Sequence, residues 1–337
     1  MPRLRLKHAS FALRLSGLLV FPVLFVFNRQ ILRDALDAMQ EANLGFVAAA
    51  TALMLLASIV RAMRWRIAAE AAGIHYPQFL DYLSIYYAGL FLGAAVPQIA
   101  ASFAPVVLMT EDGHSWRRST VSILFDRLLE TLAILVVAFV AALYLIPSHQ
   151  RLSAIVLMIS VGGFAAIGVG ALLLAKAPRV IERIERGPLV RLRKVTDIFL
   201  SVEAQTLYSG LRARAGSLSA LSLAVVVLQV SVVVLLAEAL SLDASIVFLA
   251  AVAAMVVLVV MVPLSFAGLG SREAILVVLF TAAGEPKDAA VALGVLLFAV
   301  GLIARLPGAL GWLRRSRPSL PPVPAAASIE SRVTGMD

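Results

Sequence analysis

The stretch VPLSFAGLGSRE, residues 262–273, decides how the rest of the chain is interpreted. It ends an uncharged run, residues 244–271, and then places Arg272 and Glu273 side by side before apolar residues resume. Proline removes a backbone donor and disfavours helix in the residue before it. Pro263 therefore predicts a break between two short helical arms, and the two adjacent charges need a reason to lie inside an apolar segment.

The composition around this break is that of an integral membrane protein. Of the 337 residues, 61% are hydrophobic and only 15% are charged, which is far from the mix of a soluble domain. A helix that crosses about 30 Å of hydrocarbon needs roughly 20 apolar residues. The segments that satisfy this requirement are residues 9–27, 42–60, 119–146, 152–175, 218–240 and 289–312.

A second uncharged stretch, residues 82–110, carries the same dipeptide at Val96-Pro97. Because Lys and Arg concentrate on the cytoplasmic side, the basic clusters test whether the broken stretches cross or turn back. All clusters fall on one face only if each broken stretch returns to its own side. We therefore expect an all-α polytopic membrane bundle, with about six full spans and two broken or re-entrant hairpins of opposite insertion. The expected location is a bacterial-type inner membrane, with both termini cytoplasmic.

The same pattern predicts the domain organisation. Residues 1–313 form one transmembrane domain, in which residues 178–216 are an amphipathic connection on the cytoplasmic surface. Residues 314–337 are expected to be a disordered cytoplasmic tail that is basic and rich in proline. No room remains for a soluble catalytic domain, and no catalytic motif is recognisable, so we do not expect an enzyme.

The second arm after Pro263 predicts an anion site inside the membrane. Twelve helical residues rise about 18 Å, so an arm that starts at Arg272 begins near mid-depth. Gly268 and Gly270 permit a sharp turn, and Ser271 is a suitable N-cap. Arg272 adds a full charge to the positive helix terminus, and Glu273 can balance it. The alternative is a solvated loop at the outer surface.

A second set of charges lies in SILFDRLLETLAIL, residues 122–135. Asp126 and Glu130 share a helix face, and Arg127 can reach Glu130 at the three-residue spacing. Ionisable groups at this depth face a bundle interior or a watery cavity. They could contact a substrate, or form a structural ion pair between helices. Arg305, close to the other end of the chain, can balance one of these carboxylates or extend to the inner surface.

Basic and aromatic residues also follow the second predicted crossing, at Arg61, Arg64, Trp65 and Arg66. Residues of these types are enriched at the membrane interface, so we interpret them as anchors. They could also hold anionic headgroups.

Composition excludes other kinds of site. There are no cysteines, and the four histidines are scattered at the ends of apolar runs, so we expect no metal site and no cofactor. The net charge of +9 reflects membrane insertion rather than nucleic-acid binding.

Several motifs together resemble a known family. They are RxxRW, YYAGLFLGAAVP, SILFDRLLETLAIL, VPLSFAGLGSREAI and GLIARLPGALGWL, spread over residues 44–313. In this order they are similar to the flippase-like transmembrane domain of the lysylphosphatidylglycerol synthases. The resemblance implies movement of a lipid between leaflets, whereas the soluble domain that aminoacylates the headgroup in those synthases is absent from this sequence.

One difference from the family concerns the first break. Relatives carry a glycine-rich turn with an acidic residue and then an arginine, whereas this chain has PQIAASFAPVVLM, in which Gln98 and Ser102 are the polar residues. Either the first hairpin has lost its headgroup contacts, or the protein handles a different lipid.

The sequence thus predicts lipid translocation, with an anionic or phosphate-bearing headgroup bound at the buried charges. The partner is expected to be a membrane phospholipid or a polyprenyl-type lipid, with no nucleic acid and with a separate lipid-modifying enzyme as a further candidate partner. The alternatives are a non-catalytic partner subunit or scaffold, and a headgroup transferase that uses Asp126 or Glu273 as a general base.

Overall fold

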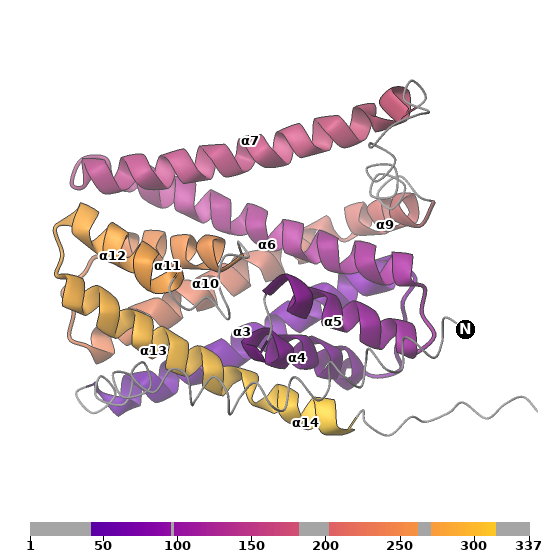
Figure 1. Cartoon of the computed structure of the whole chain (residues 1–337), viewed down its shortest axis with the longest axis horizontal. Helices are drawn as coiled ribbons and strands as arrows, with labels where there is room; N and C mark the ends of the chain where they lie inside the picture. The colour runs from indigo at the N-terminus through magenta and orange to yellow at the C-terminus, as the bar shows by residue number, and fades with distance from the viewer. Residues whose placement is uncertain (1–41, 96–97, 182–201, 262–270, 315–337) are drawn as a thin grey trace, which may run out of the picture.

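The computed structural model describes residues 42–95, 98–181, 202–261 and 271–314, and within these ranges all regular secondary structure is helical (Figure 1). The helices are α3 (Leu44–Ala71), α4 (Phe79–Ala95), α5 (Gln98–Glu111), α6 (Trp116–Leu145), α7 (Gln150–Ile181), α9 (Val202–Ala213), α10 (Ala215–Ala239), α11 (Ile246–Met261), α12 (Ser271–Ala283), α13 (Lys287–Arg305) and α14 (Pro307–Arg314). The predicted all-α class is confirmed.

Five of the described helices are long and apolar enough to cross a membrane. They lie in α3, α6, α7, α10 and in the α13–α14 segment, and their ranges are Leu44–Ala71, Trp116–Leu145, Gln150–Leu173, Ala215–Ala239 and Lys287–Leu310. These helices correspond to five of the six predicted crossings. The remaining one, residues 9–27, lies outside the described residues. The chain is a multi-pass membrane protein.

Helix α3 runs farther than the sequence pattern predicts. The Asn43 side chain accepts a hydrogen bond from the Gly45 N–H at its start. The helix continues beyond the predicted limit at residue 60 and stops at Ala71, where Gly73 has a φ of 78°. The Ile74 N–H then bonds to the Ala69 carbonyl at 2.9 Å, a C-terminal geometry that glycine accommodates. This extra length carries the arginines of RxxRW into the bundle.

The two predicted hairpins are confirmed as packed pairs of short helices. Helix α4 packs against α5, and α11 packs against α12. Their arms have 13 to 17 residues, or about 20 to 25 Å of helix. Each arm is therefore shorter than the hydrocarbon layer of about 30 Å.

The hairpins enter the bundle from opposite ends (Figure 1). The α4–α5 pair starts after the end of α3 and leads into the start of α6, whereas the α11–α12 pair starts after the end of α10 and leads into α13. Helices α3 and α10 are antiparallel neighbours, because the Asn43 N–H bonds to the Ala239 carbonyl at 3.0 Å. The described ends of the arms, at Ala95 and Met261, consequently point toward the middle of the molecule.

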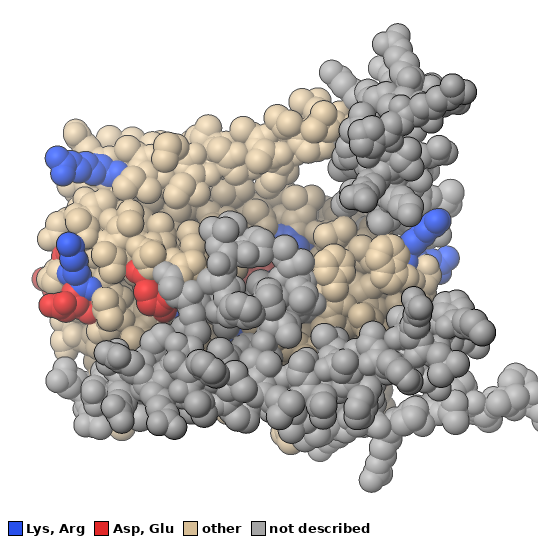
Figure 2. Space-filling model, in the orientation of Figure 1, with Lys and Arg blue, Asp and Glu red and all other residues tan. Residues whose placement is uncertain are grey.

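The two ends of the bundle differ in charge. In Figure 2, charged side chains gather mainly at the ends, and the broad surface between them is mostly uncharged. The end at which α6 begins, called here the basic end, exposes Arg117, Arg118, Arg212 and Arg214. The opposite end exposes more acidic than basic groups among the described residues: Glu238, Asp243 and Asp288, with Arg151 and Lys287.

The apolar core forms two clusters along the bundle. One joins the first half of α3 and the second half of α6 to α10, α11, α12 and α13. The other joins the second half of α3 and the first part of α6 to α4 and α5. Between Ala50 and Ala62 on α3, and between Val121 and Ile134 on α6, the chain passes from one cluster to the other. Asp126 and Glu130 lie in this intermediate zone of α6, and Arg64 lies just beyond it on α3.

Candidate functional site

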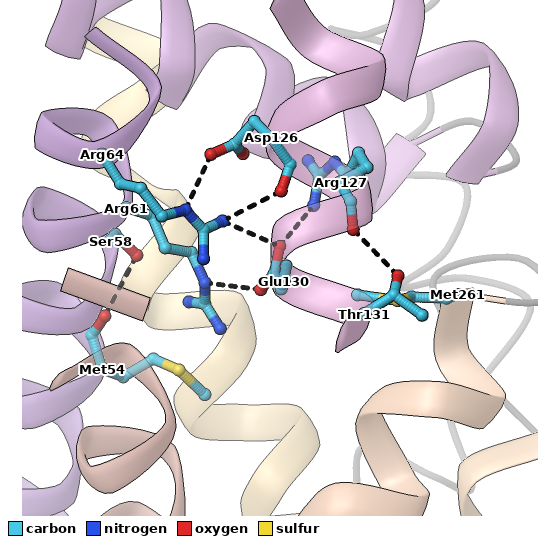
Figure 3. Close-up of polar contacts among 9 residues, drawn as sticks. All are labelled: Met54, Ser58, Arg61, Arg64, Asp126, Arg127, Glu130, Thr131 and Met261. Atoms are coloured by element: carbon cyan, nitrogen blue, oxygen red, sulfur yellow. Dashed lines mark hydrogen bonds and ion pairs between the residues drawn. The ribbon is translucent and has the colours of Figure 1, made fainter. Parts of the chain in front are cut away.

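Five charged residues of α3 and α6 form one group, called here the α3–α6 charge cluster (Figure 3). Its members are Arg61, Arg64, Asp126, Arg127 and Glu130. In Figure 3 the arginines of α3 extend across the interhelical space toward the carboxylates of α6. Because Arg61 and Arg64 are three residues apart, and Asp126 and Glu130 are four apart, each pair lies on one helix face. The two faces meet.

Arg64 is the most deeply buried member, with no exposed surface. Its Nε donates to Asp126 Oδ1 at 2.8 Å, and one terminal nitrogen donates to the Asp126 main-chain carbonyl at 3.4 Å. The same nitrogen lies 3.6 Å from Glu130 Oε2. A buried arginine without partners would be very costly, so these contacts are what allow it to lie in the interior.

Glu130 receives three arginines. Its Oε1 accepts from Arg61 Nε at 2.8 Å, and its Oε2 lies 3.2 Å from a terminal nitrogen of Arg127 and 3.6 Å from Arg64. The Arg127–Glu130 contact confirms the pairing predicted from their spacing. The carboxylate is thereby saturated with cationic donors, and the cluster as a whole has three arginines for two carboxylates.

The charge cluster is connected to the second hairpin through the next residue of α6. The Thr131 hydroxyl donates to the Arg127 carbonyl at 2.8 Å and lies 3.5 Å from the sulfur of Met261 (Figure 3). Met261 is the last residue of α11. The turn of α6 that carries Arg127 therefore packs against the end of the arm that precedes the break.

A small cavity lies beside the cluster, with a volume of about 30 Å³. Its lining includes Trp65, Gly89, Gly93, Asp126, Arg127 and Arg305. That volume is about the share of one water molecule in the liquid. Four of the lining side chains are hydrogen-bond donors, namely Trp65, Tyr86, Arg127 and Arg305, and the cavity brings together residues of α3, α4, α5, α6 and α13.

Arg272 lies apart from this cavity, at the start of α12. Only 7% of it is exposed, its Nε lies 3.5 Å from Glu273 Oε1, and its guanidinium sits over the Phe298 ring, 5.4 Å from the centroid. Among the described residues, its Nε makes no hydrogen bond. The aromatic ring of α13 supplies a cation–π contact, and Arg272 is thus a buried cation with weak pairing.

Metal binding is not supported in the part of the chain that the structure describes. No three His, Asp or Glu residues gather there as the ligands of an ion would.

The comparison with family models identifies the chain. The model described as the lysylphosphatidylglycerol synthase TM region matches residues 10–308. The chain belongs to this family. A comparison with curated proteins finds no match.

Membership of the lysylphosphatidylglycerol synthase TM region family carries a coarse functional statement. The family is one of membrane proteins, and its name ties the region to lipid metabolism. The match concerns the transmembrane region of the synthase, which agrees with the resemblance drawn from the motifs.

The structure brings some of the predicted site residues together. Asp126, Arg127 and Glu130 come together with α3, and Arg305 shares a cavity with Asp126 and Arg127. The alternative reading of Asp126 and Glu130 as interhelical ion pairs is what the geometry shows.

At the second hairpin, Ser271 is the first residue of α12 rather than a cap before it, so the arm begins one residue earlier than predicted. Glu273 is half-buried beside Arg272. Gly268 and Gly270 lie outside the described residues, as do the side chains of Gln98 and Ser102.

The interpretation of Arg61, Arg64, Trp65 and Arg66 as interfacial anchors is wrong for the first three. Arg64 and Trp65 are buried, and the Arg61 side chain is only 11% exposed. Arg66 alone behaves as predicted, since it is exposed and pairs with Glu70 at 2.6 Å. The carboxylates in α6 were the signal that could have corrected this, because two buried acids require basic partners.

Proposed function

We propose that this member of the lysylphosphatidylglycerol synthase TM region family translocates a membrane lipid, and that an anionic or phosphate-bearing headgroup passes the buried charges between the two hairpins. The observation that carries the proposal is an excess of positive charge among buried and partly buried residues. The α3–α6 charge cluster, Arg305 and the Arg272–Glu273 pair together contain five arginines and three carboxylates. Two positive charges lack counter-charges among these residues, and such a group inside a membrane marks a substrate path.

The arrangement of the hairpins supports a pathway through the middle. The segments at the two breaks, residues 94–102 and 262–270, contain no ionisable residue, so they add no further charge there. Arms that stop short of the full hydrocarbon thickness leave polar backbone near mid-depth, which is tolerated where it lines a cavity. The acyl chains of the lipid would stay in the bilayer while the headgroup crosses.

The charge of the two ends supports an orientation. The basic end carries the exposed arginines at the start of α6 and around α9, and basic residues favour the cytoplasmic side. In a bacterial-type inner membrane, the α4–α5 hairpin would then enter from the cytoplasm and the α11–α12 hairpin from outside. A separate enzyme would modify the headgroup if modification is required, because this proposal assigns no catalytic residue.

A scaffold function is the second candidate, and one observation favours it. Asp126 and Glu130 are both engaged by arginines of α3, so these carboxylates already have a structural use. A scaffold needs the paired charges but has no use for Arg272, whose pairing is weak.

The decisive experiment compares lipid movement in reconstituted vesicles. Wild-type protein should accelerate the transfer of a labelled anionic phospholipid between leaflets, and Arg272→Ala should slow it by about tenfold or more, as expected for loss of a charge-assisted contact. Arg66→Ala, which alters an exposed arginine, serves as the matched control and should keep the wild-type rate. Equal rates for wild type and protein-free vesicles would favour the scaffold.

A further inference from the structure

Trp65, which lines the cavity beside the α3–α6 charge cluster, has a buried indole N–H without a partner among the described residues. The residue is 1% exposed, and its Nε1 has no hydrogen-bond acceptor among the described residues. A buried donor without an acceptor costs about 1–3 kcal/mol. An acceptor that reaches this N–H as the cavity widens would satisfy it.

Two arginines line the same cavity with donors to spare. Arg127 contacts Glu130 through one terminal nitrogen at 3.2 Å, and about a third of its side chain is exposed. For Arg305, the described residues provide no hydrogen bond and no carboxylate within 4.0 Å. Two arginines and a tryptophan with an unpaired N–H thus line one space beside Asp126, and guanidinium and N–H donors are the groups that recognise the oxygens of a phosphate.

The carboxylates next to the cavity are not free to receive a cation. Asp126 is engaged by Arg64, and Glu130 is shared by Arg61, Arg64 and Arg127. Asp126 lines the cavity but already pairs with Arg64, and an ammonium group there would face an excess of arginine charge. Like charges in a poorly solvated site repel strongly, so the site discriminates against headgroups that carry an amine.

Resting on the proposed translocation, we infer that this cavity is a subsite for a lipid phosphomonoester, held by Arg127, Arg305 and the Trp65 N–H, and that the transported headgroup carries no cation. A phosphomonoester bears a charge between −1 and −2, which matches the two excess positive charges. The headgroup therefore differs in sign from the aminoacylated lipid in the family name.

Phosphate binding requires the cavity to widen, because its present volume of about 30 Å³ is that of one water molecule. The α4 wall at the cavity presents Gly89 and Gly93, which have no side chains. Helix α14 packs directly on α4 at Gly308. A small outward shift of α4 and α14 would therefore enlarge the site without breaking the ion pairs between α3 and α6.

The test is native mass spectrometry of the full chain with three lipids that share the same acyl chains. The probes are phosphatidic acid, phosphatidylethanolamine and lysyl-phosphatidylglycerol at equal concentration. We expect at least about tenfold preference for phosphatidic acid over the lysylated lipid, which corresponds to the strength of one charge-assisted hydrogen bond. Equal or greater retention of lysyl-phosphatidylglycerol would overturn the inference and leave translocation intact.

Variants locate the subsite. Arg127→Gln and Arg305→Gln should each lower retention of phosphatidic acid by about tenfold, and Trp65→Phe by about threefold. Arg305→Lys, which keeps the charge, should stay within about threefold of wild type, whereas Arg66→Gln should match wild type. Unchanged retention in both glutamine variants would overturn the location, and a thermal unfolding midpoint within the range of Arg66→Gln establishes that each variant is folded.

Two further measurements distinguish failure of the proposed subsite from failure of the proposed lipid translocation. Inorganic phosphate, added at the concentration of the lipid, should not displace phosphatidic acid, and full displacement would mean that the site recognises free phosphate. Failure to retain any of the three lipids, together with no lipid movement in vesicles, would overturn the proposed function itself. Lipid movement without a preference for phosphatidic acid would overturn the subsite alone.

Discussion

The α3–α6 charge cluster and the Arg272–Glu273 pair are both buried groups of charge, but they differ in how completely they are paired. In the cluster, each carboxylate lies within 2.8 Å of an arginine on another helix. Among the described residues, Arg272 has as partners only its sequence neighbour at 3.5 Å and an aromatic ring. Buried charges of one protein can therefore differ in their use: the first group holds two helices together, whereas Arg272 is only weakly paired within the described residues.

The largest effect should come from breaking the cluster. Asp126→Asn removes the charge that faces Arg64, which has no exposed surface. Removing one partner of a buried pair costs about 3–5 kcal/mol, and we expect this loss in the free energy of unfolding, measured by denaturant titration in micelles.

Glu70→Gln is the matched control, since it breaks the Arg66–Glu70 pair, in which the Arg66 side chain is 45% exposed. It should cost less than about 1 kcal/mol. Similar losses for the two variants would show that the cluster is as well solvated as the surface, and the contrast between the two regions would disappear.

The next largest effect should come from disturbing the packing of α14 against α4 at Gly308. A Cβ atom at Gly308 would overlap the Tyr87 carbonyl oxygen and approach the Phe91 Cβ within 2.7 Å. Because backbone lies in the way, Gly308→Ala should destabilise the protein by about 1–3 kcal/mol.

Gly301 on α13 provides the control, because a Cβ there meets nothing within 4 Å. Gly301→Ala should leave stability unchanged or raise it by up to about 1 kcal/mol, as alanine favours helix. If both alanines were tolerated equally in thermal unfolding, α14 would not be packed firmly against α4.

A smaller effect distinguishes members within the cluster. Arg61→Gln removes one of three arginines from Glu130, which keeps Arg64 and Arg127. Its side chain is 11% exposed, and glutamine can still donate a hydrogen bond, so we expect a loss of about 1 kcal/mol in the free energy of unfolding. A loss as large as that of Asp126→Asn would show that Glu130, rather than Asp126, anchors the cluster.

Part of this fold could be predicted from the sequence alone. Proline and the distribution of basic residues predicted the two hairpins, because a lost backbone donor and a bias in membrane insertion are local properties. The Arg127–Glu130 contact was predictable from spacing along one helix. The length of α3 was not, since hydropathy treats Arg61 and Arg64 as interfacial residues and cannot register that their partners are 69 and 62 residues away.

The candidate site shows the same limit. Arg305 and Asp126 are far apart in sequence, and only the folded bundle brings them to one cavity, which residues of α3, α4 and α5 also line. Trp65 was assigned to the interface because tryptophan is common there, and its unpaired N–H is a property of the folded core. Sequence reasoning found the charged residues themselves, but it could not determine which of them were already paired.

Arg272→Met should change the free energy of unfolding in the opposite direction to Asp126→Asn. Arg272→Met replaces a weakly paired buried cation with an apolar side chain of similar length. Glu273, whose side chain is 28% exposed, stays in contact with solvent and is not left as an isolated buried charge. Replacing poorly compensated buried charge with apolar groups is neutral or stabilising, so stability should stay level or rise by about 1 kcal/mol. Lipid movement in vesicles should nevertheless fall, as expected where a functional residue is retained at a cost in stability. A fall in stability of more than about 2 kcal/mol would place Arg272 with the structural charges of the cluster, and the difference between the two regions would then be one of degree.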